Sequence, residues 1–169
     1  NSVHLNTIVV AIKRYADSFE GSEDVTEEPV LKDARLSMTD RIMGMQWTMK
    51  DLIDENMAKM FGEAEKAFSN SEFFRLGDSF RILTDDSDDT RRIFATFPKE
   101  NLYRSGLAKI KISVPEQNRA DVVSYVTEIL HRNGVVLVDA LFSQDGIVLI
   151  LNADQAPLAY EKLRSEIPR

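Results

Sequence analysis

The chain has 169 residues and a mass of 19.2 kDa, enough for one compact domain or two small ones of about 75 residues each. Apolar residues make up 43% and charged residues 29%, which excludes a disordered or fibrous chain. The net charge of −7 repels phosphate backbones, so the composition argues against nucleic-acid binding by these residues. The absence of cysteine excludes disulfides, thiolate nucleophiles and cysteine-bound zinc, and it fits a reducing cytoplasm.

Two continuous apolar runs, Ile8–Ile12 and Ile147–Leu151, are far shorter than the roughly 18 residues that cross a bilayer. Lys13 and Arg14 follow the first run instead of preceding it, which does not fit a secretory signal. We therefore expect a cytoplasmic protein with no membrane partner. Because the sequence begins without Met and becomes helical in pattern almost at once, we also expect a piece of a longer chain.

Residues 1–29 are expected to form an amphipathic helix followed by an acidic linker. The helix, from Val3 to Phe19, has apolar residues at helical spacing, and Asp17–Pro29 is rich in acidic residues and Ser.

The next segment, residues 30–104, predicts a strand, a helix, two strands and a short helix. Strands are expected at Leu31–Met38 and on both sides of Gly77-Asp78, at Phe73–Leu76 and Phe80–Leu83. Helices are expected at Met49–Phe68 and Asp88–Phe97.

Residues 105–169 predict the same order of elements more clearly. Ala108–Val114 alternates as a half-buried strand, Asn118 caps a helix with Asp121 in its first turn, and Gly134 ends that helix. The remaining elements are the strands Val135–Phe142 and Ile147–Leu151 and a last helix capped by Asp154, with Pro157 in its first turn.

The two segments are predicted to be copies of one β-α-β-β-α unit, because Leu31–Met38 and Leu107–Val114 match in their apolar positions. The fold class is therefore α+β, with two tandem antiparallel sheets that each have helices on one face. Such a unit leaves sheet edges exposed and one strand missing. We therefore expect copies to complete each other, in a homodimer or a higher oligomer.

The sequence contains no pattern typical of catalysis or metal binding. No glycine-rich phosphate loop or nucleophile elbow occurs, and His4 and His131 have no partner at a useful spacing. The acidic run Asp85–Asp89 lacks the mid-loop Gly and closing Glu of a calcium loop, which favours helix capping and solvation. We expect no enzymatic activity, no cofactor and no metal.

The closing segment resembles the ACT domain, a small ferredoxin-like module of regulators of amino-acid metabolism. The residues that carry the resemblance are Ile110–Val114, the helix Ala120–His131, the run Asn133–Val138 and the strand Ile147–Leu151. The resemblance covers Leu107–Ile167 well and Val30–Phe97 weakly, in an arrangement similar to tandem ACT-type regulators of archaea. The front helix, Asn6–Tyr15, is similar to the last helix of a helix-turn-helix unit whose earlier helices are absent.

This resemblance implies a site for an amino-acid effector where the first strand turns into the first helix, against the second strand of a neighbouring copy. Backbone N–H groups at the helix start could hold a carboxylate, and polar side chains could meet an ammonium group. Arg119-Ala120-Asp121 replaces the Asp-x-Pro-Gly-like turn of ligand-binding members. The residues implied are Glu116, Gln117, Asn118, Arg119, Ala120, Asp121, Asn133, Gly134 and Val135.

Three functions remain open on the sequence. The first is a sensor that binds an amino acid between copies. The second is a ligand-free module that dimerises a DNA-binding transcriptional regulator, with DNA contacted only through a missing N-terminal head. This is suggested by Lys13-Arg14 and by the lost Gly turn. The third is a regulatory subunit that docks onto a biosynthetic enzyme. The competing interpretation of the implied site is that Asn118 and Asp121 only cap a helix and that Gly134 only ends it.

Overall fold

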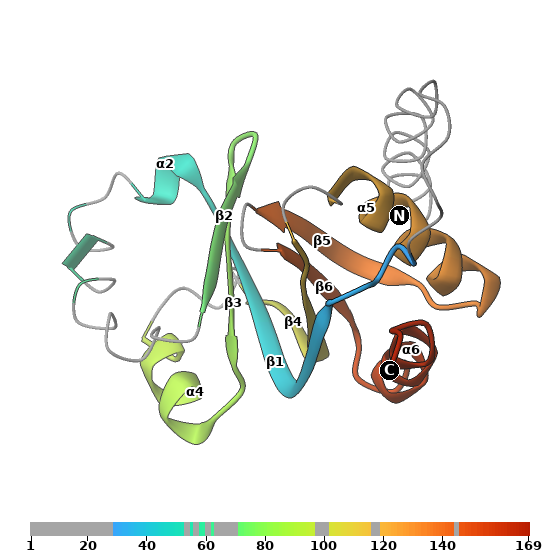
Figure 1. Cartoon of the computed structure of the whole chain (residues 1–169). Helices are drawn as coiled ribbons and strands as arrows, with labels where there is room; N and C mark the ends of the chain where they lie inside the picture. The colour runs from blue at the N-terminus through green and yellow to red at the C-terminus, as the bar shows by residue number, and fades with distance from the viewer. Residues whose placement is uncertain are drawn as a thin grey trace. The chain divides into compact units, whose positions relative to one another are not determined.

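The computed structural model describes residues 29–52, 71–96, 102–115, 119–143 and 146–169, and four single positions between 55 and 62. The predicted front helix, nearly all of the acidic linker and most of the predicted helix Met49–Phe68 lie outside these residues. The described part combines antiparallel strand pairs with α-helices, so the predicted α+β class is confirmed (Figure 1).

The described residues contain six strands and four helices. The strands are β1 (Arg35–Thr48), β2 (Glu72–Leu76), β3 (Ser79–Asp85), β4 (Leu102–Ser113), β5 (Leu137–Ser143) and β6 (Gly146–Asn152). The helices are α2 (Met49–Leu52), α4 (Asp88–Phe94), α5 (Arg119–Arg132) and α6 (Ala156–Ser165). Both predicted hairpins are confirmed, since β2 pairs with β3 and β5 pairs with β6 in antiparallel register.

The chain divides into two compact units that are interleaved along the sequence. Unit 1 comprises residues 1–39 and 108–169, and unit 2 comprises residues 40–107. Strands β1 and β4 contribute to both units, so unit 1 has the order β5-β6-β4-β1 and unit 2 the order β2-β3-β1-β4. Each unit therefore has four strands within the described residues, and the same chain supplies all of them. The sequence suggested that one strand of each unit is missing. The predicted repeat boundaries, 30–104 and 105–169, stay a prediction about the sequence repeat.

Unit 1 has a core in which α5 and α6 cover one side of β4, β5 and β6 (Figure 1). Ile110, Ile112, Leu149, Val126 and Leu163 are all at most 1% exposed. Full burial of such side chains contributes about 1.5–3 kcal/mol each before the entropy of folding is counted.

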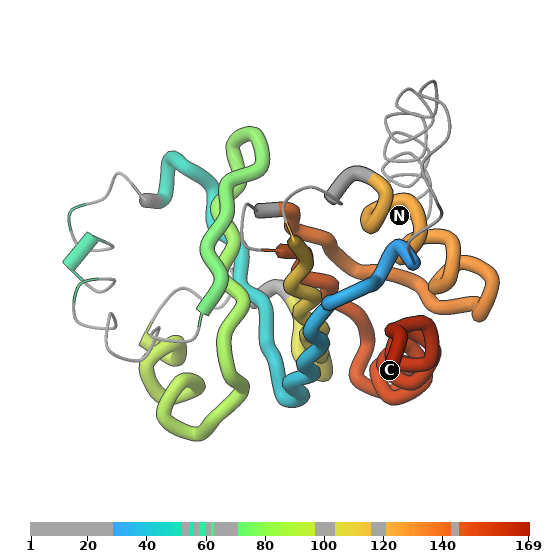
Figure 2. The backbone as a smooth tube through the Cα atoms, viewed as in Figure 1, coloured from blue at the N-terminus to red at the C-terminus, as the bar shows by residue number. Residues whose placement is uncertain are grey.

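Unit 2 has a smaller core on one face of β1 and β3. The register pairs Met45 with Ile82 and Trp47 with Phe80, so these side chains share a face. Phe94 of α4 packs there, with its ring centroid 6.0 Å from that of Trp47. Figure 2 shows the β2–β3 hairpin beside β1.

The predicted strand Leu31–Met38 differs in its bounds, because β1 begins at Arg35 and continues to Thr48. Leu31 is buried, but it lies in a turn closed by the backbone bond from Ala34 N to Leu31 O at 3.1 Å. The alternation that identifies a strand is interrupted at Arg41, which has a φ of 53° and so departs from extended backbone.

The start of α6 corrects one predicted cap. Gln155, and not Asp154, is the N-cap residue, and no side-chain bond caps this helix. Pro157 lies in the first turn as predicted, where its missing N–H costs little.

Candidate functional site

The C-terminal end of α5 holds the three implied site residues Asn133, Gly134 and Val135. Gly134 has a φ of 69°, the left-handed conformation that ends a helix, as predicted. Val135 N donates to Leu130 O at 3.0 Å, and Asn133 Nδ2 donates to Ile129 O at 2.7 Å. These bonds satisfy carbonyl groups at the helix end, so these donors already serve a cap.

The backbone just after this cap is tied to α6 by Gln155, a residue that the sequence did not indicate. Gln155 Oε1 accepts from Val136 N at 3.1 Å, and Gln155 Nε2 donates to Gly134 O at 3.5 Å. This pair of bonds fixes the start of β5 against the start of α6. No sequence pattern marks a glutamine before a helix as a residue that bonds to a distant part of the backbone. The sequence alone therefore does not predict the contact of Gln155.

The N-terminal end of α5 holds the other implied residues. Glu116, Gln117 and Asn118 lie outside the described residues, and the helix begins at Arg119. Asp121 is exposed in the first turn, where a carboxylate is favourable beside the positive end of the helix dipole.

The two groups of implied residues are not brought together within one chain. A helix rises about 1.5 Å per residue, so the 14 residues of α5 separate its ends by about 20 Å. Residues 119–121 lie at one end and residues 133–135 at the other. A site that uses both groups therefore cannot form from the two ends of a single α5.

Unit 2 has a corresponding strand-to-helix turn that the sequence reasoning missed, between β1 and α2. Thr48 N donates to Asp51 Oδ2 at 3.2 Å, and Asp51 N donates back to Thr48 Oγ1 at 3.3 Å. This reciprocal pair is a capping box. The sequence signal for this turn is the Thr-x-x-Asp spacing. It is overlooked when the strand is expected to end at Met38, because Thr48 then does not stand at the end of a strand.

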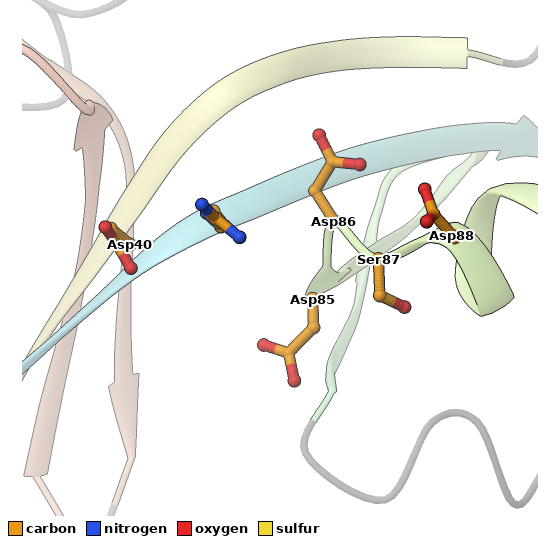
Figure 3. Close-up of a pocket in the computed structure, with 6 residues that line it drawn as sticks. Asp40, Asp85, Asp86, Ser87 and Asp88 are labelled. Atoms are coloured by element: carbon orange, nitrogen blue, oxygen red, sulfur yellow. The ribbon is translucent and has the colours of Figure 1, made fainter.

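Unit 2 also contains an acidic pocket of about 490 Å³ between β1 and the turn from β3 to α4 (Figure 3). Figure 3 shows the carboxylates of Asp85 and Asp86 pointing in opposite directions, so these acids do not converge on one point. The remaining lining residues are Asp40, Arg41, Ser87 and Asp88. Among the described residues, no group of three or more His, Cys, Asp or Glu side chains is arranged to hold a metal ion.

Two residues of this pocket have identifiable structural roles. Ser87 is the N-cap of α4, and its Oγ accepts from Thr90 N at 3.1 Å, which confirms helix capping in the acidic run. Asp86 accepts from Arg91 Nη2 at 2.7 Å. The bond from Arg91 lowers the pKa of Asp86 despite partial burial, and the same bond raises the pKa of Arg91.

A side-chain hydrogen bond joins α5 to the C-cap residue of α6. Tyr125 Oη donates to Glu166 Oε2 at 2.6 Å. This bond, followed by desolvation, raises the pKa of Tyr125.

In the part of the chain that the structure covers, no helix is both long and apolar enough to cross a membrane.

No protein-family model matches the sequence, and neither does any curated protein. Solved structures do match it. The chain is similar to the ligand-free regulatory subunit of aspartate kinase from Thermus thermophilus, with 13% identity and a TM-score of 0.59 over 79% of this chain and 97% of that one. It is also similar to aspartate kinase of Clostridium acetobutylicum, with 9% identity and a TM-score of 0.61 over 78% of this chain and 33% of that one.

A third similar structure is E. coli aspartokinase III in complex with aspartate and ADP, with 15% identity and a TM-score of 0.60. The match covers 85% of this chain and 35% of that one. The chain therefore corresponds to about a third of the whole kinases and to nearly all of the separate regulatory subunit. At these identities the comparison establishes the fold, and the expected ACT-like, ferredoxin-like fold is confirmed.

Proposed function

We propose that this protein is a cytoplasmic, non-enzymatic regulator of amino-acid metabolism that senses an amino acid at an interface between two copies. The observation that carries the proposal is the match of its fold to almost the whole of a separate regulatory subunit. One similar structure, of E. coli aspartokinase III, is described as a complex with lysine and aspartate in the T-state, at 13% identity and a TM-score of 0.50.

The location proposed for the effector follows from the two ends of α5. The start of α5 offers backbone N–H groups and a positive dipole end, which suit a carboxylate. Asp121, exposed beside it, suits an ammonium group. The partner copy would supply residues 133–135, because α5 separates the two groups within one chain.

A thermal-shift screen of the full chain against the twenty amino acids tests this proposal. We expect at least one amino acid to raise the midpoint temperature in a saturable way, because a ligand that binds only the folded state stabilises it. Asp121→Ala should abolish that shift, and Asp78→Ala, an exposed change in the β2–β3 turn, should retain it. No shift with any amino acid, or a shift that Asp121→Ala leaves intact, would contradict the proposal.

One observation favours a second function, a ligand-free dimerisation module of a DNA-binding regulator. The backbone N–H groups of Asn133, Gly134 and Val135 and the side-chain Nδ2 of Asn133 already donate to carbonyl oxygens of α5. This function predicts that no amino acid binds. It also predicts that a longer chain with an N-terminal head binds DNA upstream of its own gene, while residues 1–169 do not. Electrophoretic mobility shifts with the two chains distinguish the functions.

A regulatory subunit also requires a target. Because the chain corresponds to a subunit or domain that accompanies a kinase in similar proteins, we propose a biosynthetic enzyme as its partner. Affinity purification from the native cell tests this, and recovery of the chain without any enzyme would argue against it.

A further inference from the structure

The cap that ends α5 contains a chemically labile peptide. Asn133 and Gly134 form the only Asn-Gly pair in the sequence, and they directly follow the last residue of α5. Asparagine is a thermolabile residue, and it loses its side-chain amide most readily before glycine, which has no Cβ to hinder attack by its backbone nitrogen. Gly134 is exposed, so water reaches this peptide. The pair is therefore a site where the chain can modify itself, in a segment whose contacts the structure describes.

The reaction places two demands on the local geometry. Gly134 N attacks Cγ of Asn133, and the new C–N bond closes a succinimide ring. The bond from Cγ to Nδ2 breaks, and Nδ2 leaves as ammonia with the hydrogen that Gly134 N has given up. Water then adds to either ring carbonyl and opens the ring to aspartate or isoaspartate. Gly134 N–H must therefore leave its hydrogen-bond acceptor, and the side chain of Asn133 must turn toward Gly134 N.

The cap of α5 blocks both steps. Gly134 N donates to His131 O at 3.1 Å, so its hydrogen is already held. Asn133 Nδ2 donates at 2.7 Å to the carbonyl of Ile129, four residues earlier, which directs this side chain back along α5 and away from Gly134 N. Two hydrogen bonds of ordinary strength must therefore break before the ring can close. Together they reduce the population of the reactive conformation by about thirtyfold.

Gln155 holds the same peptide from its other side. Its Nε2 donates to Gly134 O at 3.5 Å, and its Oε1 accepts from Val136 N at 3.1 Å. Val135, between these two bonds, is 7% exposed, and its N donates to Leu130 O at 3.0 Å. Gly134 is therefore held by α5 through its N–H and by the N-cap residue of α6 through its carbonyl. The peptide cannot rotate into the reactive conformation unless the bonds from Gln155 open as well.

We propose that Asn133 is a deamidation site, that the α5 cap keeps it closed in the folded chain, and that Gln155 controls its rate. The reaction occurs in the fraction of molecules in which the cap is open, so its rate follows local opening at this end of α5. The product has a carboxylate that cannot donate to Ile129 O, and it adds negative charge at the negative end of the helix dipole. Modification therefore weakens the cap that prevented it. The inference goes beyond the proposed function, because it needs neither a ligand nor a second copy.

Peptide mass spectrometry of the full chain, incubated at mildly alkaline pH, tests the proposal. Replacement of the amide by a carboxyl group raises the mass of the peptide that contains residue 133, and chromatography separates isoaspartate from aspartate. We expect deamidation of the folded chain to be about thirtyfold slower than that of the chain unfolded in urea at the same pH and temperature. Gln155→Ala should raise the rate in the folded chain severalfold and leave the rate in urea unchanged.

Two control variants separate this local effect from a general loss of stability. Asp154→Ala changes the exposed neighbour of Gln155, which makes none of these bonds, and Tyr125→Phe removes a side-chain bond elsewhere in unit 1. Both should deamidate as slowly as the starting chain when folded. Equal rates in the folded and the urea-unfolded chain, or no deamidation of residue 133 in urea, would overturn the proposal. A folded rate that Gln155→Ala does not raise, or that a control variant raises equally, would also overturn it.

Discussion

Gly146 is the position where a single added methyl group should do the most damage to unit 1. A Cβ there would be 2.2 Å from Ile112 O, whereas real Cβ atoms are essentially never closer than 3.0 Å to a neighbour. The atom in the way is backbone, so β4 or β6 must move. In addition, Gly146 has a φ of 148°, which side-chain-bearing residues rarely adopt.

The cost of Gly146→Ala is the sum of two effects. Forcing extra volume into a packed core costs about 1–3 kcal/mol, and a sparsely populated backbone conformation costs about 1–3 kcal/mol. We therefore expect a loss of about 4 kcal/mol in the free energy of unfolding, or a fall of about 12 °C in the midpoint temperature for a chain of this length. The control is Gly134→Ala, with a φ of 69° and no atom within 4 Å of the added Cβ. It should lose only about 1–2 kcal/mol.

Urea unfolding followed by far-ultraviolet circular dichroism measures both variants. The fluorescence of Trp47, the single tryptophan, reports unit 2, where it is 1% exposed. If Gly146→Ala and Gly134→Ala are destabilised equally, β6 does not begin against the end of β4.

Three further predictions concern single contacts. Ser87→Ala should destabilise α4 by about 1 kcal/mol, since it removes an N-cap, whereas Ser87→Asn should cost much less; urea unfolding measures both. Because Arg91 lowers the pKa of Asp86 in the folded state, their bond stabilises the protein above the ordinary aspartate pKa, and this stabilisation is lost as the pH falls through the lower folded value. Asp86→Asn should therefore be destabilised at neutral pH and converge with the unmodified chain in acid, and parallel unfolding curves at all pH values would refute this. Because the bond to Glu166 raises the pKa of Tyr125, this tyrosine should ionise at a higher pH than an ordinary tyrosine. Ultraviolet titration should show this late ionisation in the unmodified chain and not in Tyr125→Phe.

The sequence predicted the elements that have strong local signals. Gly134 was recognised as a helix end because only a left-handed residue fits there, and its φ of 69° confirms it. The hairpin around Gly77 was recognised from two short apolar runs, and β2 and β3 confirm it. The sequence did not reveal the full length of β1, because Arg41 interrupts the strand alternation with a left-handed conformation.

The sharing of β1 and β4 between two units could not be predicted from the sequence, because strand partners are set by tertiary packing and not by local pattern. The compact units are interleaved along the chain, and the predicted repeat boundaries stay a prediction. The effector site remains a prediction. Its two groups of residues lie at opposite ends of α5, a separation that could be computed from the predicted helix length alone.

The central claim is that an amino acid binds between two copies and depends on both. By thermodynamic linkage, a ligand held by both copies must strengthen their association by the same factor by which association strengthens ligand binding. Sedimentation equilibrium of the full chain, with and without the amino acid found in the thermal screen, measures this directly. We expect tighter dimerisation at saturating amino acid. An association constant unchanged by a bound amino acid would contradict it.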